Sequence, residues 1–459
     1  MLKIIFLNND IINSIQNEVH RNMSIRTKLA KTIGLTVKFG LGLLTGGGSS
    51  LPGKIAHKIS PNILKDSAKD YDTVIITGTN GKTLTTTLTS NILSKINPNI
   101  ITNRAGSNMV QGIIGAFLNG KKTKERGIAV IEVDEGSLNK VVEALNPKLI
   151  VHTNLFEDQA ERYGDTKAAY QLLVEAANKV PNAKILANGD LPLFNSVNLI
   201  NEVIYFGLKP NLTDKDIRIA CPKCGGRLHY NTRTYSNLGE YECTSCGITR
   251  PDLTYSVDKI IDDTLSSTTF TIEGKPFTIP IAGIYNVYNA LAAYSVAREF
   301  NVEREIIHNS LQTTARVFGR QEIIPIEDKT ATLNVVKNPV GLNQVIDLIE
   351  RETEPMTFVA ILNNKPADGV DLSWLQDGHF EKLSEIGIEE VLTGGIRADK
   401  MTERLVEAGF DRTVIEEYDT EDALMNRILH AKHKNVQIIA TYTAMLEFRK
   451  ELKDRGFLK

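Results

Sequence analysis

Runs of apolar, often β-branched residues alternate with helix-like segments along most of this chain. Continuous apolar strands separated by helices predict a parallel sheet whose two faces are both covered. Because ligands of such α/β folds bind outside the carboxyl ends of the strands, we expect functional residues to follow the runs. The strongest early runs lie at residues 73–77, 128–133, 149–153 and 184–187.

A second, smaller α/β block begins after Gly319 and Arg320, a pair with the character of a hinge. We therefore expect a central domain at residues 54–318 and a C-terminal α/β domain at residues 319–459. The strands of the second block are expected at residues 356–362, 390–393 and 436–441.

The loop after the first apolar run has the pattern G-x-x-G-K-T and opens a helix-like segment. A glycine-rich turn between a strand and a helix offers backbone N–H groups and the positive helix end to a phosphate. Lys82 adds a mobile positive charge, and Thr83 adds a hydroxyl for Mg²⁺. The pattern is a short P-loop, because the usual form has a further glycine at the place of Ile76. We expect nucleotide binding by Gly78, Thr79, Asn80, Gly81, Lys82 and Thr83.

Other polar residues stand at places where they could complete such a site. Glu132 ends a strand, where its carboxylate could hold Mg²⁺ opposite Thr83, although an acidic strand end can also be solvated surface. Asn286 and Asn289 are three residues apart on one helix face, where amides can read a base edge. Helix capping is the simpler role, and it fits Asn286 better. Arg320 is available to a phosphate.

The four cysteines form the pattern C-x₂-C-x₁₈-C-x₂-C, which is typical of a structural zinc site. Disulfides are the alternative, but they are rare in a cytoplasmic protein. Four thiolates leave no open position on the ion, so zinc would build structure rather than catalyse a reaction. We expect a zinc ribbon inserted at about residues 205–254, with ligands Cys221, Cys224, Cys243 and Cys246.

Composition narrows the range of functions. The chain has 459 residues, 42% hydrophobic content and a formal net charge of −2, which gives no reason to expect nucleic acid binding. No apolar run approaches the ~20 residues that span a bilayer, and the first residues make no convincing signal peptide. We therefore expect a cytoplasmic protein.

Residues 23–65 contain several Lys and Arg but no Asp or Glu, and apolar residues are interleaved with them. One interpretation is an element that lies on an anionic membrane surface; the other is a helix packed on the nucleotide domain. Gly40, Gly42 and Gly46-Gly47-Gly48 should interrupt a long helix, which slightly favours the second interpretation. We assign residues 1–53 to an N-terminal basic segment, in which residues 1–22 look like an upstream extension.

Taken in order, these motifs resemble the Mur ligase family, from about residue 50 onward. The resemblance is carried by the P-loop, Thr153-Asn154-Leu155 with Asp158, the helix with Gly283, Asn286 and Asn289, Gly319-Arg320 and Asn338-Pro339. It implies a Mur ligase-type α/β fold that uses ATP and Mg²⁺ to make an acyl phosphate. It places Lys82 and Thr83 on phosphate and Mg²⁺, Glu132 on Mg²⁺, Asn289 on adenine and Arg320 on the γ-phosphate.

Within the family, the cysteine ribbon and residues 336–341 and 367–374 are similar to the branch that amidates D-glutamate in lipid II. That resemblance implies that a GatD-type glutamine amidotransferase partner supplies the ammonia. It also implies that the protein acts at the inner face of the cell membrane. It further implies that an acid of the C-terminal domain completes the partner's Cys–His pair. Asp371 is the first choice and Asp368 the second. Trp374 is either a partner anchor or a core residue.

Two other functions remain open from the sequence. Another Mur-type ligase could add an amino acid to a soluble carboxylate, although a domain that grips a UDP-sugar is missing. A nucleotide-gated zinc-ribbon adaptor for nucleic acid is opposed by the near-neutral charge. Gln159, at the place of a metal-binding His of other family members, puts a second metal site in question.

Overall fold

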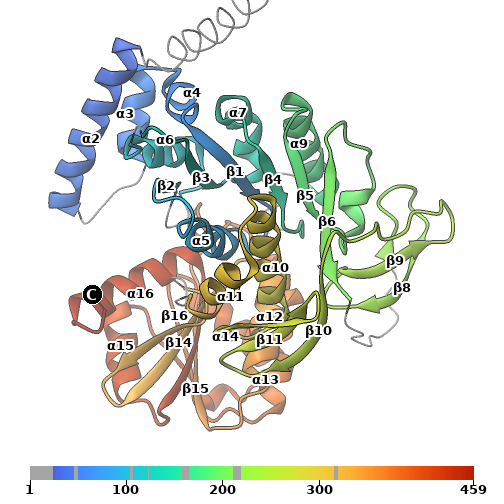
Figure 1. The fold of residues 1–459 in the computed structure, drawn as a ribbon. Coiled ribbons are helices and arrows are strands. Elements are labelled where there is room, and N and C mark those ends of the chain that lie inside the picture. Colours follow the sequence, from blue (N-terminus) through green and yellow to red (C-terminus); the bar gives the residue numbers. More distant parts are fainter. Residues whose placement is uncertain are drawn as a thin grey trace, which may run out of the picture.

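The structure, a computed structural model, consists of two α/β units and a small ribbon (Figure 1). It describes residues 24–45, 50–103, 107–121, 123–157, 165–209, 219–314 and 319–458. The expected extension at residues 1–22 and Gln159 lie outside this part of the chain. No helix within it is both long enough and apolar enough to cross a bilayer.

The central unit is built on a nine-stranded sheet whose order is β12-β11-β10-β6-β5-β4-β1-β3-β2. All neighbouring pairs from β2 to β10 are parallel, as predicted, but β11 and β12 extend the edge as an antiparallel hairpin. The strands are β1 Tyr71–Thr77, β2 Ile100–Thr102, β3 Gly127–Glu132, β4 Leu149–His152, β5 Lys184–Asn188, β6 Val203–Leu208, β10 Tyr255–Asp263, β11 Thr268–Ile272 and β12 Lys275–Ile279.

Helices cover both faces of this sheet, which explains why its inner strands are apolar without alternation. Val74, Ile75 and Ile76 of β1 are all fully buried. On one face α5, α10 and α11 pack together; on the other, α4 packs on α6 and α7, and α7 packs on α9 (Figure 1). The bounds are α4 Ile63–Ala68, α5 Lys82–Leu93, α6 Val110–Leu118, α7 Glu135–Leu145, α9 Thr166–Lys179, α10 Ile284–Glu299 and α11 Arg304–Gln312, with a 3₁₀ turn η1 at Pro192–Asn195.

The C-terminal unit is a six-stranded sheet of order β13-β14-β18-β15-β16-β17, in which only the β13–β14 pair is antiparallel. Two separate hydrophobic clusters cover its faces. The elements are β13 Glu322–Ile326, β14 Lys329–Val335, α12 Pro339–Ile349, β15 Met356–Ile361, η2 Ser373–Asp377, α13 Glu381–Glu385, β16 Val391–Gly394, α14 Ala398–Glu407, η3 Arg412–Val414, β17 Ile415–Glu417, α15 Glu421–Leu429, β18 Asn435–Ala440 and α16 Tyr442–Asp454.

The ribbon is a three-stranded antiparallel sheet of β7 Ile219–Ala220, β8 Arg227–Arg233 and β9 Gly239–Cys243. The predicted start of the insertion at Tyr205 is wrong. Tyr205 lies inside β6, which pairs with β5 and β10 in the central sheet. The prediction did not use β6 as a strand, although residues 203–208 read Val-Ile-Tyr-Phe-Gly-Leu, an apolar run that favours one.

The helices α2 Ile25–Thr45 and α3 Leu51–Ile59 come before α4 in the chain, and α2 packs against α3 and α6. The helix α2 is therefore packed on the nucleotide domain, as the second interpretation expects, and this packing leaves its outer side open to the first. The prediction that Gly40 and Gly42 interrupt the helix is wrong, because α2 continues to Thr45. A glycine costs a helix only about 1 kcal/mol, which is too little to end a helix of this length.

Candidate active site

The P-loop adopts a conformation that only glycine permits at two positions. Gly78 and Gly81 have φ values of +130° and +82°. A Cβ at Gly78 would lie 2.3 Å from the hydroxyl of Thr153, and a Cβ at Gly81 would lie 2.0 Å from the amide oxygen of Asn289. The loop therefore packs directly on the carboxyl end of β4 and on α10.

Asn154, which follows β4, fixes the middle of the loop. Its backbone oxygen accepts from the N–H of Thr79 at 2.9 Å, and its side-chain oxygen accepts from the N–H of Asn80 at 2.8 Å. Its amide nitrogen donates back to the backbone oxygen of Asn80 at 3.0 Å. These hydrogen bonds hold the loop in place, so Asn154, which the sequence analysis named only as part of the family motif, is a site residue.

Lys82 is almost fully buried at the start of α5, as its place in the motif predicts. Its ammonium group donates to the backbone oxygens of Gly78 and, at 3.2 Å, of Thr79. It also lies 3.5 Å from a carboxylate oxygen of Glu135, the first residue of α7. Burial raises the pKa of Glu135, and the charges of Lys82 and Lys337 oppose that shift. Glu135 was not predicted as a site residue, although it stands just after the strand that ends in Glu132.

Thr83 and Glu132 meet as predicted. The Thr83 hydroxyl donates to Glu132 Oε2 at 2.9 Å, and the Asn108 amide donates to the other carboxylate oxygen at 3.2 Å. Asn103 bonds both backbone groups of Glu132, at 2.7 and 2.9 Å, and so fixes the end of β3. A hydroxyl and a buried carboxylate beside a P-loop are oxygen ligands that suit Mg²⁺. The residues therefore fit this ion.

The C-terminal unit reaches the P-loop through Asn338, the N-cap of α12. Its amide nitrogen donates to the Asn80 side chain at 2.9 Å, and the Asn80 amide donates back at 3.2 Å. The same Asn338 oxygen accepts the N–H of Gly341 at 2.9 Å, which caps α12. A paired amide contact thus joins the two units at the edge of the site.

Two further side chains of the C-terminal unit interact electrostatically with Glu132. The Arg320 guanidinium donates to the backbone oxygen of Val335 at 3.0 Å. Burial lowers the pKa of Arg320, and the negative charge of Glu132 opposes this effect. Burial raises the pKa of Tyr442, and the charge of Glu132 adds to the shift. The charge of Glu132 thus acts on both side chains, and Tyr442 is an addition that the sequence did not indicate.

Asn289 and Asn286 lie under the loop and not at an open surface. The Asn289 side-chain oxygen accepts from the Thr85 hydroxyl at 3.3 Å, and its nitrogen donates to the Asn286 oxygen at 3.3 Å. Asn286 in turn donates to the backbone oxygen of Ala282 at 2.7 Å. The capping interpretation of Asn286 is wrong, because an N-cap side chain accepts from a backbone N–H. The two amides instead link α10 to the P-loop helix.

The two candidate acids in the loop after β15 differ in how exposed they are. Asp368 is buried and accepts from the N–H groups of Lys365 at 3.1 Å and Thr443 at 2.7 Å. Asp371 is exposed, and its carboxylate accepts from the N–H and hydroxyl of Ser373 at 2.8 and 2.7 Å, which lowers its pKa. Trp374 is half-buried against the C-terminal core. Asp371 is therefore the acid that another protein could reach.

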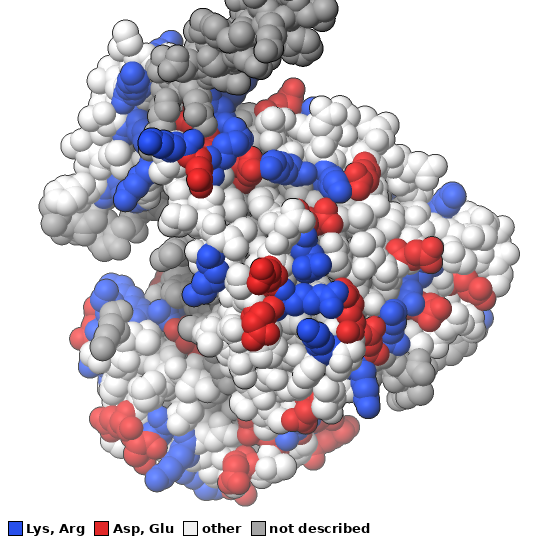
Figure 2. Space-filling view, viewed as in Figure 1, with Lys and Arg blue, Asp and Glu red and all other residues white. Residues whose placement is uncertain are grey.

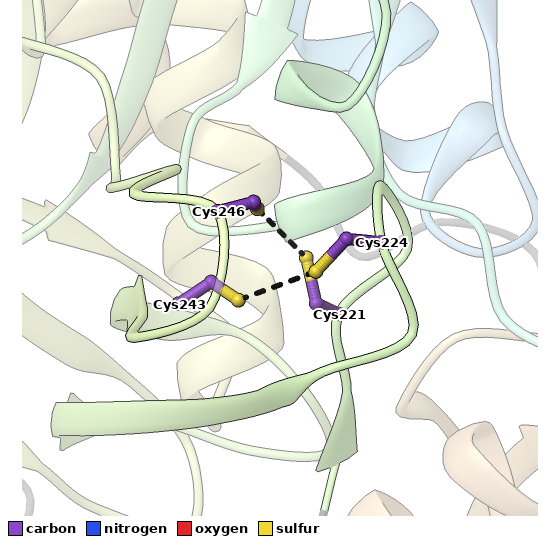
Figure 3. A group of neighbouring side chains, drawn as sticks. All are labelled: Cys221, Cys224, Cys243 and Cys246. Carbon is purple, nitrogen blue, oxygen red and sulfur yellow. Dashed lines mark hydrogen bonds between the residues drawn. The ribbon is translucent and has the colours of Figure 1, made fainter.

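The four cysteines converge as predicted (Figure 3). Their sulfur atoms all lie within 4.8 Å of one another, with 3.8 Å between Cys221 and Cys246 and 3.6 Å between Cys224 and Cys243. A tetrahedral zinc ion with Zn–S distances of about 2.3 Å requires sulfur separations of about 3.8 Å. All four are free thiols, so the donor set and its spacing fit a structural zinc ion.

The ribbon is anchored to the central unit through Asp190, a fully buried carboxylate. Asp190 accepts from the Arg250 guanidinium at 3.1 Å and from the Tyr288 hydroxyl of α10 at 2.6 Å. The ring of Tyr235, in the β8–β9 connection, packs on Tyr288 and on Phe156, with centroids 5.8 and 6.0 Å away. The N–H of Phe156 donates to the Thr79 hydroxyl at 3.0 Å. The ribbon is thus part of the wall behind the P-loop.

Metal analysis of the purified protein should find about one zinc ion per chain, because the four thiolates complete its coordination. Cys243→Ser should lose the ion and lower the midpoint of thermal unfolding by several degrees, since metal binding and ribbon folding are coupled. Thr244→Ser, an exposed neighbour, is the matched control and should keep both zinc and stability. A Cys243→Ser protein with unchanged zinc content would contradict the assignment.

Comparisons with known proteins agree with this geometry. The Mur ligase middle domain family matches residues 76–297, and the MurT ligase C-terminal family matches residues 335–445. The lipid II isoglutaminyl synthase (glutamine-hydrolyzing) subunit MurT of Streptococcus pneumoniae is 40% identical over 444 residues, which cover 95% of this chain and 99% of that protein. This chain belongs to the MurT branch of the Mur ligase family.

Solved Mur ligases share the fold of this MurT family member. A pseudomurein peptide ligase type C from Methanothermus fervidus has a TM-score of 0.63 at 22% identity and covers 86% of this chain and 80% of its own. MurF ligase from Thermotoga maritima, in complex with ADP, has a TM-score of 0.60 at 16% identity, with coverages of 87% and 85%. Mur ligases are ATP-dependent ligases that use Mg²⁺, and the MurT chain is one of them.

Proposed function

We propose that this MurT family member is the ATP-using subunit of an enzyme that amidates the α-carboxylate of D-glutamate in the lipid II stem peptide. The observation that carries the proposal is the 40% identity to a lipid II isoglutaminyl synthase subunit along almost its whole length. The contact between Thr83 and Glu132 beside the P-loop supports it, because the chemistry needs a triphosphate and Mg²⁺ held together.

In this proposal the loop residues bind the phosphates of ATP, and Thr83 and Glu132 hold Mg²⁺. A carboxylate oxygen of the substrate attacks the γ-phosphorus, which forms an acyl phosphate and releases ADP. Ammonia then attacks the carbonyl carbon and expels phosphate, so that the acid becomes an amide. Lys82 is held at the loop mouth by its backbone contacts and by Glu135, which places a buried positive charge where phosphate charge develops.

Residues from α10 and from the C-terminal unit complete the nucleotide site in this proposal. We assign Asn289, which is buried next to Gly81, to adenine on the family resemblance; its amide would then leave its contacts with Thr85 and Asn286. Arg320 contacts the γ-phosphate, and its interaction with Glu132 supports this placement. The amide pair of Asn80 and Asn338 keeps the two units together while the acyl phosphate exists. Enclosure of this kind protects a reactive intermediate from water.

The nitrogen source in the proposal is a GatD-type glutamine amidotransferase that docks near the loop after β15. All four cysteines of this chain converge at the ribbon, so the glutaminase nucleophile belongs to the partner. Asp371 would orient and charge-stabilise the partner's catalytic imidazole, the role that an acid has in a triad. Its exposure and its hydrogen bonds to Ser373, which keep it ionised, support that choice over Asp368.

Because lipid II is anchored in a membrane, we place this enzyme at the inner face of the cell membrane, as a peripheral protein. Zinc has a structural role there, in the ribbon that backs the P-loop.

The function is tested by supplying the purified complex with lipid II, ATP and Mg²⁺ and one nitrogen donor at a time. Glutamine or free ammonia should give the amidated lipid, detected by mass spectrometry, with one ATP consumed for each amide formed. Omission of lipid II should leave only background ATP hydrolysis. Preference for an amino acid donor over ammonia would contradict the proposal and favour an amino acid-adding Mur ligase.

A further inference from the structure

The helix α2 has an inner face that is tightly packed. Thr27, Ala30 and Gly34 are buried, and a Cβ on Gly34 would lie 2.8 Å from a methyl group of Leu118 in α6. The Thr27 hydroxyl lies within 3.1 Å of the Ser60 hydroxyl and donates to Asp66. This close packing fixes which side of α2 faces outward.

The outward side of α2 carries large apolar side chains that nothing in the described part of the chain covers. Ile25, Leu29 and Phe39 are 86%, 55% and 72% exposed. At 100° per residue they fall within an arc of about 80° on the helix surface. Figure 1 shows α2 at the outer edge of the molecule, on the side opposite to the ribbon. We call this surface, defined by Ile25, Leu29 and Phe39, the outer α2 face.

The charge around the outer α2 face has one sign. The exposed ions of α2 and α3 are basic: Arg26, Lys28, Lys38, Lys54 and Lys58. Between Ser24 and Lys65 the sequence contains no Asp or Glu, and the next acid, Asp66, is turned inward to Thr27. Several Lys and Arg side chains are visible at this end of the molecule in Figure 2.

We propose that the outer α2 face docks on an anionic lipid bilayer, with α2 lying along the surface. Exposed apolar side chains flanked only by basic ones are complementary to a membrane of acidic headgroups over hydrocarbon. A protein partner of ordinary mixed charge would not account for the lack of acids. The proposal of membrane attachment is argued from these residues alone. The purpose of the attachment would be to hold the P-loop unit beside a lipid-anchored substrate, and this part depends on the proposed function.

The binding test uses the full-length chain with its glutaminase partner and sedimentation with vesicles. Vesicles of phosphatidylglycerol and phosphatidylcholine should bind the complex, and pure phosphatidylcholine should bind it far less. Lys28→Gln, next to the outer α2 face, should weaken binding to the anionic vesicles roughly fivefold. Leu29→Gln/Phe39→Gln should weaken it at least tenfold. Ile261→Gln, an equally exposed apolar residue on β10, is the matched control and should bind normally.

The second arm measures amidation of lipid II in anionic vesicles and of a water-soluble analogue with a short lipid chain. The double variant Leu29→Gln/Phe39→Gln should amidate lipid II in vesicles at least tenfold more slowly than the wild type. It should amidate the soluble analogue at the wild-type rate. Unchanged vesicle binding of this variant would overturn the proposal, and so would an equal loss on both substrates. If the wild-type complex binds vesicles but amidates neither substrate, the proposed function fails while the docking surface stands.

Discussion

Lys82→Ala should reduce ATP-dependent amidation of lipid II by roughly a hundredfold or more, with glutamine and with free ammonia alike. Lys82 is the buried cation at the mouth of the P-loop, with an ammonium group that contacts two loop carbonyls and Glu135. Its removal takes away the positive charge that faces the transferring phosphoryl group. The measurement is the initial rate of amide formation at saturating ATP.

Two further variants show whether a loss of rate comes from the missing charge or from a damaged fold. Lys95→Ala, at an exposed position just beyond α5, should leave the rate unchanged. Loss of Lys82 leaves Glu135 buried without its closest cation, which can destabilise the fold. Lys82→Ala/Glu135→Gln removes both charges, so it should regain thermal stability but not activity. A normal rate in either Lys82 variant would remove the phosphate role from the loop.

Asp371→Asn should lower glutamine-driven amidation by roughly a hundredfold or more while ammonia-driven amidation stays within about twofold. An amide cannot supply the negative charge that stabilises an imidazolium, but it has nearly the same shape as the carboxylate. Since Asp371 is exposed and its carboxylate is held by Ser373 of its own loop, the ATP-dependent steps should be unaffected. The measurement is the ratio of the two rates in the complex with the glutaminase partner.

Asp368→Asn and Asp377→Asn are the controls for Asp371. Asp368 accepts the N–H of Thr443 in the first turn of α16, so its loss should weaken the C-terminal unit and lower both rates equally. Asp377 is exposed at the end of η2 and should tolerate the change. Equal losses with both nitrogen sources in Asp371→Asn would move that residue into the ATP reaction and refute its assigned role.

The parts of the site that sequence reasoning predicted depend on local rules. The P-loop glycines follow from the strand-to-helix turn, and the meeting of Thr83 with Glu132 follows from the rule that parallel strands end at one edge. The four cysteines converge because two residues separate the members of each pair and the ribbon is short.

What sequence reasoning missed depends on contacts between distant residues. The amide pair of Asn80 and Asn338 joins residues 258 positions apart, and neither side chain alone indicates its partner. Glu135 gains its role only because α7 begins next to Lys82. The choice between Asp368 and Asp371 required burial, since the sequence places both acids in the same loop. Tyr205 is different, because the apolar run of β6 was visible in the sequence and was not used.

The most direct test of the account follows oxygen through the reaction. Lipid II whose D-glutamate α-carboxylate carries ¹⁸O is amidated by the complex with ATP and ammonia, and the released phosphate is analysed by mass spectrometry. An acyl phosphate formed at the P-loop predicts that each phosphate carries one oxygen from the carboxylate. Amide formation with unlabelled phosphate would contradict the account.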